Sequence, residues 1–219
     1  MTILNVWVEH DRALVGVDSH AADPFNPADF LEVRKIYHAE RFHAVFAVRG
    51  LMGLFTVGAM HIANFPESDF DALNAAMPRL LQAAHHEVAC ALRAQGWPAG
   101  GPIDEQDAVL VGWSPARSAV VGRLFMRRHQ SPGFVPVDIT LNVAAPVEGL
   151  PSDCSLDCST QAKMALLACK QAQLLREKHA AGGGPFIVAQ VTREQIRIGK
   201  VCDLGAEPDS PAPPVRGRR

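Results

Sequence analysis

The chain has 219 residues, of which 48% are hydrophobic and 20% are charged. This composition is ordinary for a globular protein and excludes wholesale disorder. The formal net charge of −2 gives no general attraction to nucleic acid or to an anionic membrane. No apolar run reaches the roughly 18 residues of a membrane-spanning helix. We therefore expect neither a nucleic-acid partner nor a membrane partner.

The five cysteines are odd in number, which favours free thiols in a reducing compartment and hence a cytoplasmic protein. The first residues contain neither a basic segment nor a long apolar one, so we expect no signal peptide. Proline and arginine dominate the C-terminal end. We predict a single domain over residues 1–204 and a disordered Pro/Arg-rich tail over residues 205–219.

Apolar patterning and turn signals predict the elements in chain order. They are strands over 2–8 and 13–17, a loop over 21–30, short strands over 35–38 and 42–48, an apolar helix over 51–62, a helix over 70–95 capped by Ser68 or Asp69 and kinked or restarted at Pro78, strands over 108–113, 118–126 and 135–143, a helix over 161–179 capped by Asp157 or Ser159, and a last hairpin over 186–191 and 195–202. The helices come in blocks. This order excludes a doubly wound parallel fold and predicts mostly antiparallel sheets covered by helices.

A threonine directly after the first methionine suggests a self-contained catalytic pair. If Met1 is removed, the Thr2 hydroxyl can attack a carbonyl carbon while its own α-amine, with a reference pKa near 8, takes the proton. Such a nucleophile needs a nearby cation and a carboxylate that holds the cation. Asp18 and Lys35 would lie beside the start of the first strand if the two hairpins stack in one sheet. The candidate catalytic residues are therefore Thr2, Asp18 and Lys35.

The segments around these residues resemble the proteasome β-type subunits and their bacterial relatives, which are N-terminal-nucleophile hydrolases. The resemblance follows the element order over about residues 2–204. It rests on the segments 2–8, 13–19, 34–36 and 46–50, together with 109–113 and 183–191. It implies an α+β fold of four layers, an αββα sandwich of two mostly antiparallel sheets flanked by helices.

The resemblance also implies roles for individual residues. Thr2 would be nucleophile and base, Lys35 would lower pKa values, and Asp18 would hold Lys35. The backbone N–H of Arg49 or Gly50 would face the developing oxyanion. As partners, the resemblance implies a peptide or protein substrate, further copies of the chain in rings or stacked rings, and an ATP-dependent unfoldase.

The sequence departs from the family pattern at three places. Arg49 stands where the family has glycine. No Gly-Ser-Gly turn opens the third helix. The family's Asp-x-x-Ser before the closing strand is replaced by His179-Ala180-Ala181-Gly182. Ser155 and Ser159 are the candidates to supply the missing hydroxyl.

Three functions therefore stay open at this point. The first is an N-terminal threonine hydrolase that cleaves peptide amide bonds through an acyl-enzyme on Thr2. The second is a catalytically inactive subunit of the same fold with a role in assembly. The third is an amidase for a small molecule.

Two clusters invite a metal-binding interpretation: His85-His86-Glu87 with Cys90, and Cys154 with Cys158. A structural zinc ion needs about four convergent ligands, and neither cluster provides a second matched pair. We therefore expect no metal and no cofactor. Cys90 and Cys169 are expected to pack as small apolar residues.

Overall fold

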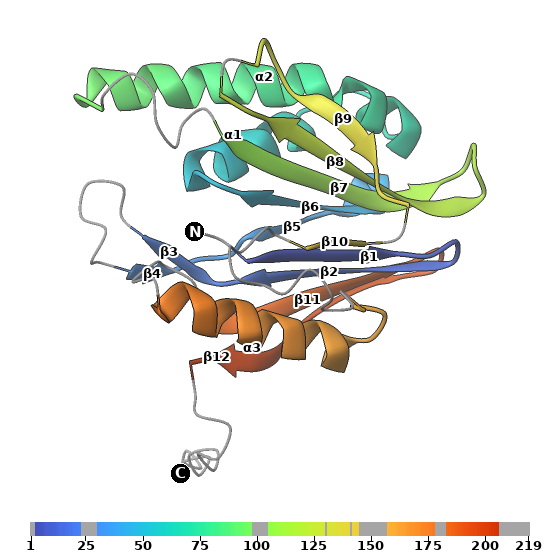
Figure 1. Ribbon diagram of the computed structural model, residues 1–219. Coiled ribbons are helices and arrows are strands. Elements are labelled where there is room, and N and C mark those ends of the chain that lie inside the picture. The colour runs from blue at the N-terminus through green and yellow to red at the C-terminus, as the bar shows by residue number, and fades with distance from the viewer. Residues whose placement is uncertain are drawn as a thin grey trace, which may run out of the picture.

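The computed structural model describes residues 3–22, 30–97, 105–129, 131–140, 142–144, 157–177 and 183–205. These residues form two five-stranded antiparallel sheets, a two-stranded ribbon and three α-helices (Figure 1). The helices are α1 (Met52–Ala63), α2 (Phe70–Ala94) and α3 (Gln161–Glu177), and a short 3-10 turn, η1, covers Glu40–Phe42. The strands are β1 (Leu4–Val8), β2 (Arg12–Asp18), β3 (His20–Ala22), β4 (Phe30–Glu32), β5 (Ile36–Ala39), β6 (Ala44–Arg49), β7 (Gln106–Ser114), β8 (Ala119–Arg127), β9 (Val135–Asp138), β10 (Asn142–Ala144), β11 (Gly184–Thr192) and β12 (Ile196–Leu204).

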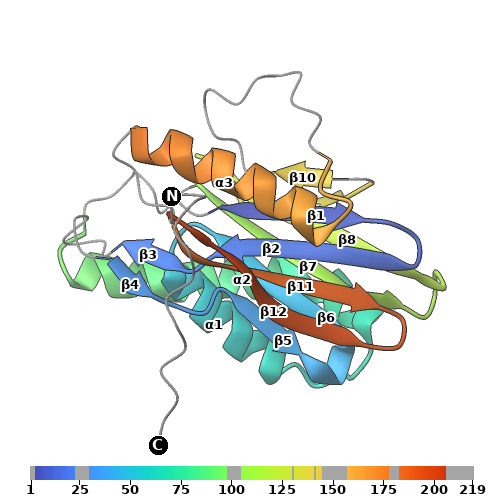
Figure 2. The same cartoon turned by 90° about the horizontal axis from the view of Figure 1, so that it is seen from below.

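The two large sheets stack face to face as an α+β sandwich. Sheet I has the strand order β10-β1-β2-β11-β12, and sheet II has the order β5-β6-β7-β8-β9. Helices α1 and α2 cover the outer face of sheet II, and α3 covers the outer face of sheet I (Figures 1 and 2). The predicted class, two antiparallel sheets flanked by helices, is confirmed at this level.

Alternate residues of the central strands enter different apolar layers. In β2, Val15 and Val17 face the other sheet while Leu14 faces α3. In β6, Val45 faces sheet I while Phe46 faces α1 and α2. Strands that are buried on both faces read as continuous apolar runs. For that reason their positions are readable from the sequence.

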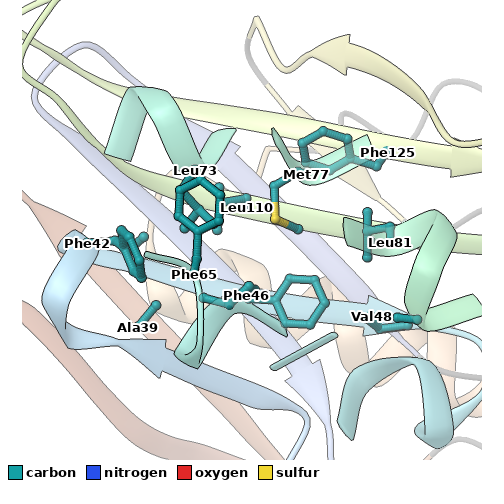
Figure 3. Packing of buried hydrophobic residues seen from close by; sticks show 14 of the residues in the cluster. Ala39, Phe42, Phe46, Val48, Phe65, Leu73, Met77, Leu81, Leu110 and Phe125 are labelled. Carbon is teal, nitrogen blue, oxygen red and sulfur yellow. The ribbon is translucent and has the colours of Figure 1, made fainter. Parts of the chain in front are cut away.

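Aromatic and long aliphatic side chains fill the layer between sheet II and its two helices. Figure 3 shows Phe46 of β6 with Met77 and Leu81 of α2, and all three side chains are fully buried. The Phe46 ring also stacks on Phe55 of α1, with 6.0 Å between the ring centroids. This packing fixes α1 and α2 on sheet II.

Helix α2 starts and continues for identifiable reasons. Asp69 caps its N-terminus, because its carboxylate accepts a hydrogen bond from Ala72 N at 2.8 Å, as one of the two predicted caps would. The helix runs through Pro78, so the predicted restart there is wrong. Proline costs a helix interior about 3 kcal/mol, and the burial of Met77 and Leu81 offsets that cost. Among the described helices, none combines the length and the apolar character needed to cross a bilayer.

Three local expectations are wrong. The predicted strand over 135–143 is two strands in different sheets, since the chain crosses from β9 to β10 and buries Ile139 between the sheets. The predicted loop over 21–30 begins and ends in the β3–β4 ribbon, which pairs antiparallel. Neither Asp157 nor Ser159 caps α3, because the hydroxyl of Thr160 accepts the hydrogen bond from Lys163 N at 3.2 Å. The two strand pairings depend on distant segments of the chain, and the cap depends on the exact residue at which the helix starts. Local patterns in the sequence do not show either.

Replacing Phe46 by alanine should lower the free energy of unfolding by about 3–5 kcal/mol, because the change leaves a cavity between sheet II and its helices. Chemical denaturation followed by circular dichroism measures this loss. The matched control is Leu166→Ala on α3, where the side chain is 66% exposed. The control should change the free energy by less than about 0.5 kcal/mol, and equal losses in both variants would contradict the described packing.

Candidate functional site

The structure brings Asp18 and Lys35 together in a buried ion pair. The Lys35 ammonium donates to Asp18 Oδ1 at 3.0 Å, and the two side chains are 1% and 0% exposed. Asp18 ends β2, and Lys35 directly precedes β5. Because exposed ion pairs contribute little while buried ones constrain their surroundings strongly, this pair is the centre of the candidate site.

The sequence predicts that the hairpins carrying Asp18 and Lys35 stack in one sheet. In the structure the two residues come from different sheets. Strand β2 belongs to sheet I, and β5 belongs to sheet II. Lys35 therefore reaches Asp18 across the space between the facing sheets. The hairpins stack face to face because each of their strands has two apolar faces to bury, and pairing edge to edge would leave one face exposed.

Both carboxylate oxygens of Asp18 have further partners from the backbone. Ile3 N donates to Oδ1 at 2.9 Å, and Gly183 N donates to Oδ2 at 3.3 Å. The Lys35 ammonium also donates to the carbonyl oxygen of His20. Four separate segments of the chain thus converge on one ion pair at the end of the sandwich where β1 starts.

Burial dominates the electrostatics of the pair. Burial raises the pKa of the Asp18 carboxyl, and the Lys35 ammonium and the two backbone N–H donors oppose this rise. Burial lowers the pKa of the Lys35 ammonium, and Asp18 opposes this fall. A buried ammonium held in this way can stabilise negative charge that develops beside it.

Gly184 allows the backbone of β11 to approach the segment after Asp18. Its φ is +71°, in the region that favours glycine. A Cβ atom at this position would lie 2.5 Å from His20 Nε2 and 2.7 Å from Ser19 Oγ. Glycine at position 184 is therefore a steric requirement for the close approach that brings Gly183 N to Asp18.

Arg49 lies at the end of sheet II that carries Lys35, because β5 starts where the antiparallel β6 ends. Its guanidinium donates from Nε to Asp107 Oδ2 at 2.9 Å. Arg128 binds the other oxygen of the same carboxylate. The Arg49 side chain is thus fixed by Asp107, a contact that the sequence analysis did not predict.

Gly50 connects β6 to α1 with a φ of +137°. A Cβ atom here would collide with the side-chain amide of Gln106. The same amide oxygen accepts a hydrogen bond from Leu51 N at 2.8 Å. This contact holds the start of α1 in place, while the predicted oxyanion role of the Arg49 or Gly50 N–H stays a prediction.

Several predicted residues lie outside the described residues: Met1, Thr2, Ser155 and the segment 179–182. Ser159 is described, and its backbone N–H binds Asp157 at 2.9 Å. Asp157 acts electrostatically on Glu9, which follows the far end of β1. Ser159 is therefore at the wrong end of the sandwich to supply a hydroxyl to Asp18 and Lys35.

A second buried polar pair stands next to the site and escaped the sequence analysis. Asn5 Nδ2 donates to Gln171 Oε1 at 2.7 Å, and Gln171 Nε2 donates to Asn5 Oδ1 at 3.0 Å. Both residues are fully buried, Asn5 in β1 and Gln171 in α3. A polar residue inside the apolar run of β1 is the signal that could have identified it. The pair ties the start of β1 to α3.

A cavity of about 420 Å³ lies elsewhere in the molecule. Its lining comes from the turns at the other end of the sheets and includes His10, Ser118 and Glu194. There, the Arg193 guanidinium stacks over the Trp113 ring at 5.3 Å. The cavity is therefore separated from Asp18 by the length of β2.

No group of three or more His, Cys, Asp or Glu side chains within the described ranges could hold a metal ion. His86 of the first predicted cluster instead contacts Cys90 at 3.7 Å, and Glu87 binds His61. In the second cluster, Cys154 lies outside the described residues. Cys90 and Cys169 are exposed, so the expectation that they pack as small apolar residues is wrong.

Comparisons of the sequence with models of known protein families and with curated proteins found no match. The resemblance to proteasome β-type subunits therefore stays a prediction.

Removing one partner of the buried ion pair should lower the free energy of unfolding strongly. Removing both partners should lower it by less than the sum of the two single losses. We expect Lys35→Met or Asp18→Asn alone to lower the free energy of unfolding by about 3–5 kcal/mol, because each leaves a charge buried without its partner. The double variant should lose clearly less than the sum of the two. Urea denaturation of all four proteins measures this coupling, and additive losses would contradict the pair.

The Asp18→Asn variant should become more stable as the pH rises towards about 10.5. Without Asp18, burial still lowers the pKa of Lys35 below its value in the unfolded chain, so the unfolded state binds more protons in this range. Urea denaturation at several alkaline pH values measures the slope. The double variant with Lys35→Met lacks this group and serves as the control; the same slope in both would contradict the assignment.

Proposed function

We propose that the protein is an N-terminal threonine hydrolase, similar to proteasome β-type subunits, that cleaves peptide amide bonds through an acyl-enzyme on Thr2. The observation that carries the proposal is the Asp18–Lys35 ion pair at the start of β1. Ile3, whose N–H binds Asp18 at 2.9 Å, is the residue bonded to Thr2. A nucleophile one residue before Ile3 would begin beside a buried carboxylate that holds a buried ammonium.

In the proposed mechanism, removal of Met1 frees the α-amine of Thr2. The Thr2 hydroxyl attacks the substrate carbonyl carbon, and the amine takes its proton and later passes it to the leaving amine. Lys35 stabilises the negative charge on the attacking oxygen, and Asp18 holds Lys35 in position. The backbone N–H of Arg49 or Gly50 would bind the oxyanion.

The layered architecture supports the proposal. Two antiparallel sheets between helices are what the resemblance implies, and both Arg49 and Gly50 lie at the same end of sheet II as Lys35. Under this proposal the substrate is a peptide or protein, and an ATP-dependent unfoldase would deliver folded substrates.

A second candidate is a non-catalytic assembly subunit of the same fold. The observation that favours it is Arg49, which stands where the family has glycine and whose guanidinium is held by Asp107 at 2.9 Å. This role needs neither a free Thr2 nor an intact ion pair.

The first test is the state of the N-terminus and its reactivity. Intact-mass spectrometry should show loss of Met1. A β-lactone should acylate the protein once, at Thr2, because attack of the Thr2 hydroxyl on the lactone carbonyl opens the lactone ring. Retention of Met1 would overturn the proposal. A protein without Met1 that resists the lactone would favour the assembly role.

The second test uses variants in a fluorogenic peptide assay. Thr2→Ala should lower kcat on the order of 10³-fold or more, because the nucleophile is lost. Thr2→Ser keeps a hydroxyl and should keep measurable activity. Thr56→Ala, on the exposed side of α1, is the matched control and should leave the rate unchanged. An unchanged rate of hydrolysis in the Thr2→Ala variant would contradict the mechanism.

A further inference from the structure

Two of the four described cysteines meet across the boundary between a helix and a sheet. Cys169 lies on α3, and Cys202 lies on β12, the edge strand of sheet I. The two sulfur atoms lie near enough to each other for Cys169 to raise the pKa of the Cys202 thiol. Helix α3 packs directly on β12, and Cys202 belongs to the apolar layer between them.

Small residues on α3 make this approach possible. Ala165 and Ala172 lie on its buried face about one turn before and after Cys169, so the buried positions next to Cys169 carry short side chains. Cysteines must stand close to each other to form a disulfide without strain. A close helix–sheet approach is the kind of packing that places two such residues within reach.

The two thiols differ in their access to solvent. Cys169 is exposed, whereas Cys202 is partly buried and Cys158 is fully buried. A dissolved oxidant therefore meets Cys169 first and does not reach Cys158. Burial, together with the neighbouring Cys169 sulfur, raises the pKa of the Cys202 thiol to about 11, so Cys202 keeps its proton at neutral pH.

We propose that Cys169 and Cys202 form a dithiol site that hydrogen peroxide converts into a reversible intramolecular disulfide. The Cys169 thiolate attacks one peroxide oxygen; the O–O bond breaks, a sulfenic acid forms on Cys169, and water leaves after proton uptake. The Cys202 sulfur then attacks the Cys169 sulfur, the S–O bond breaks, and a second water leaves with the Cys202 proton. Two thiols are oxidised and one peroxide is reduced to two waters.

The disulfide would join α3 to the edge of sheet I. Because strand β11 lies between the two cysteines in the sequence, the bond would close a loop that contains it. The site is independent of the proposed hydrolase chemistry, since neither cysteine contacts Asp18 or Lys35 in the described interactions. It would act on the same helix that binds β1 through Gln171.

The test treats the full-length protein with hydrogen peroxide at neutral pH and then alkylates the remaining thiols. We expect Cys169 and Cys202 to lose their reactivity together and the protein to lose two hydrogens in its intact mass. Tryptic digestion without reductant should yield the peptides 164–170 and 201–216 joined by a disulfide. Dithiothreitol should restore both thiols, because a disulfide is reversible whereas sulfinic acid is not.

Matched variants separate the pair from other cysteines. Cys169→Ser and Cys202→Ser should each abolish the linked peptides, whereas Cys90→Ser removes another exposed thiol and should leave them unchanged. Phenylarsine oxide gives a second measurement on the unmodified protein: its arsenic binds two neighbouring thiols with loss of one water. Failure to bind the arsenical, linkage to Cys90 or Cys158, or peroxide products that stop at sulfinic acid on Cys169 would each overturn the proposal.

Discussion

Burying Asp18 against Lys35 removes two charges from water, which costs several kcal/mol for each ion unless both find polar partners. The described contacts supply them: the N–H groups of Ile3 and Gly183 bind the carboxylate, and the His20 carbonyl accepts from the ammonium. These partners come from separate parts of the chain. The pair can therefore form only when β1, β2, β11 and the segment before β5 have all reached their places.

The sequence predicts the positions of most elements because nearly all strands and helices contain long apolar stretches with clear turn residues between them. What it does not predict is which strands meet. The run over 135–143 has one pattern, yet Ile139 passes between the sheets and divides it into β9 and β10. No local sequence pattern predicts that the two hairpins stack face to face. Each sheet covers the other only after distant segments of the chain have paired.

Some residues of the candidate site could likewise be predicted from the sequence, and others could not. Asp18 and Lys35 could be identified because a nucleophilic Thr2 needs a nearby cation and a carboxylate that holds it. Asn5 stands out as a polar residue inside the apolar run of β1, but its partner Gln171 could not be identified, because the packing of α3 on that face of β1 depends on distant segments. The contact of Asp107 with Arg49 likewise depends on the pairing of β6 with β7.

The Asn5–Gln171 pair has a consequence for how α3 rests on its sheet. The buried face of α3 carries alanines together with larger apolar side chains such as Met164 and Leu175, and apolar burial by itself is not directional. Each amide, however, donates to and accepts from the other. Sliding the helix by one turn would leave two buried amides without partners, at about 1–3 kcal/mol for each unmet group. The pair thus selects one axial register for α3.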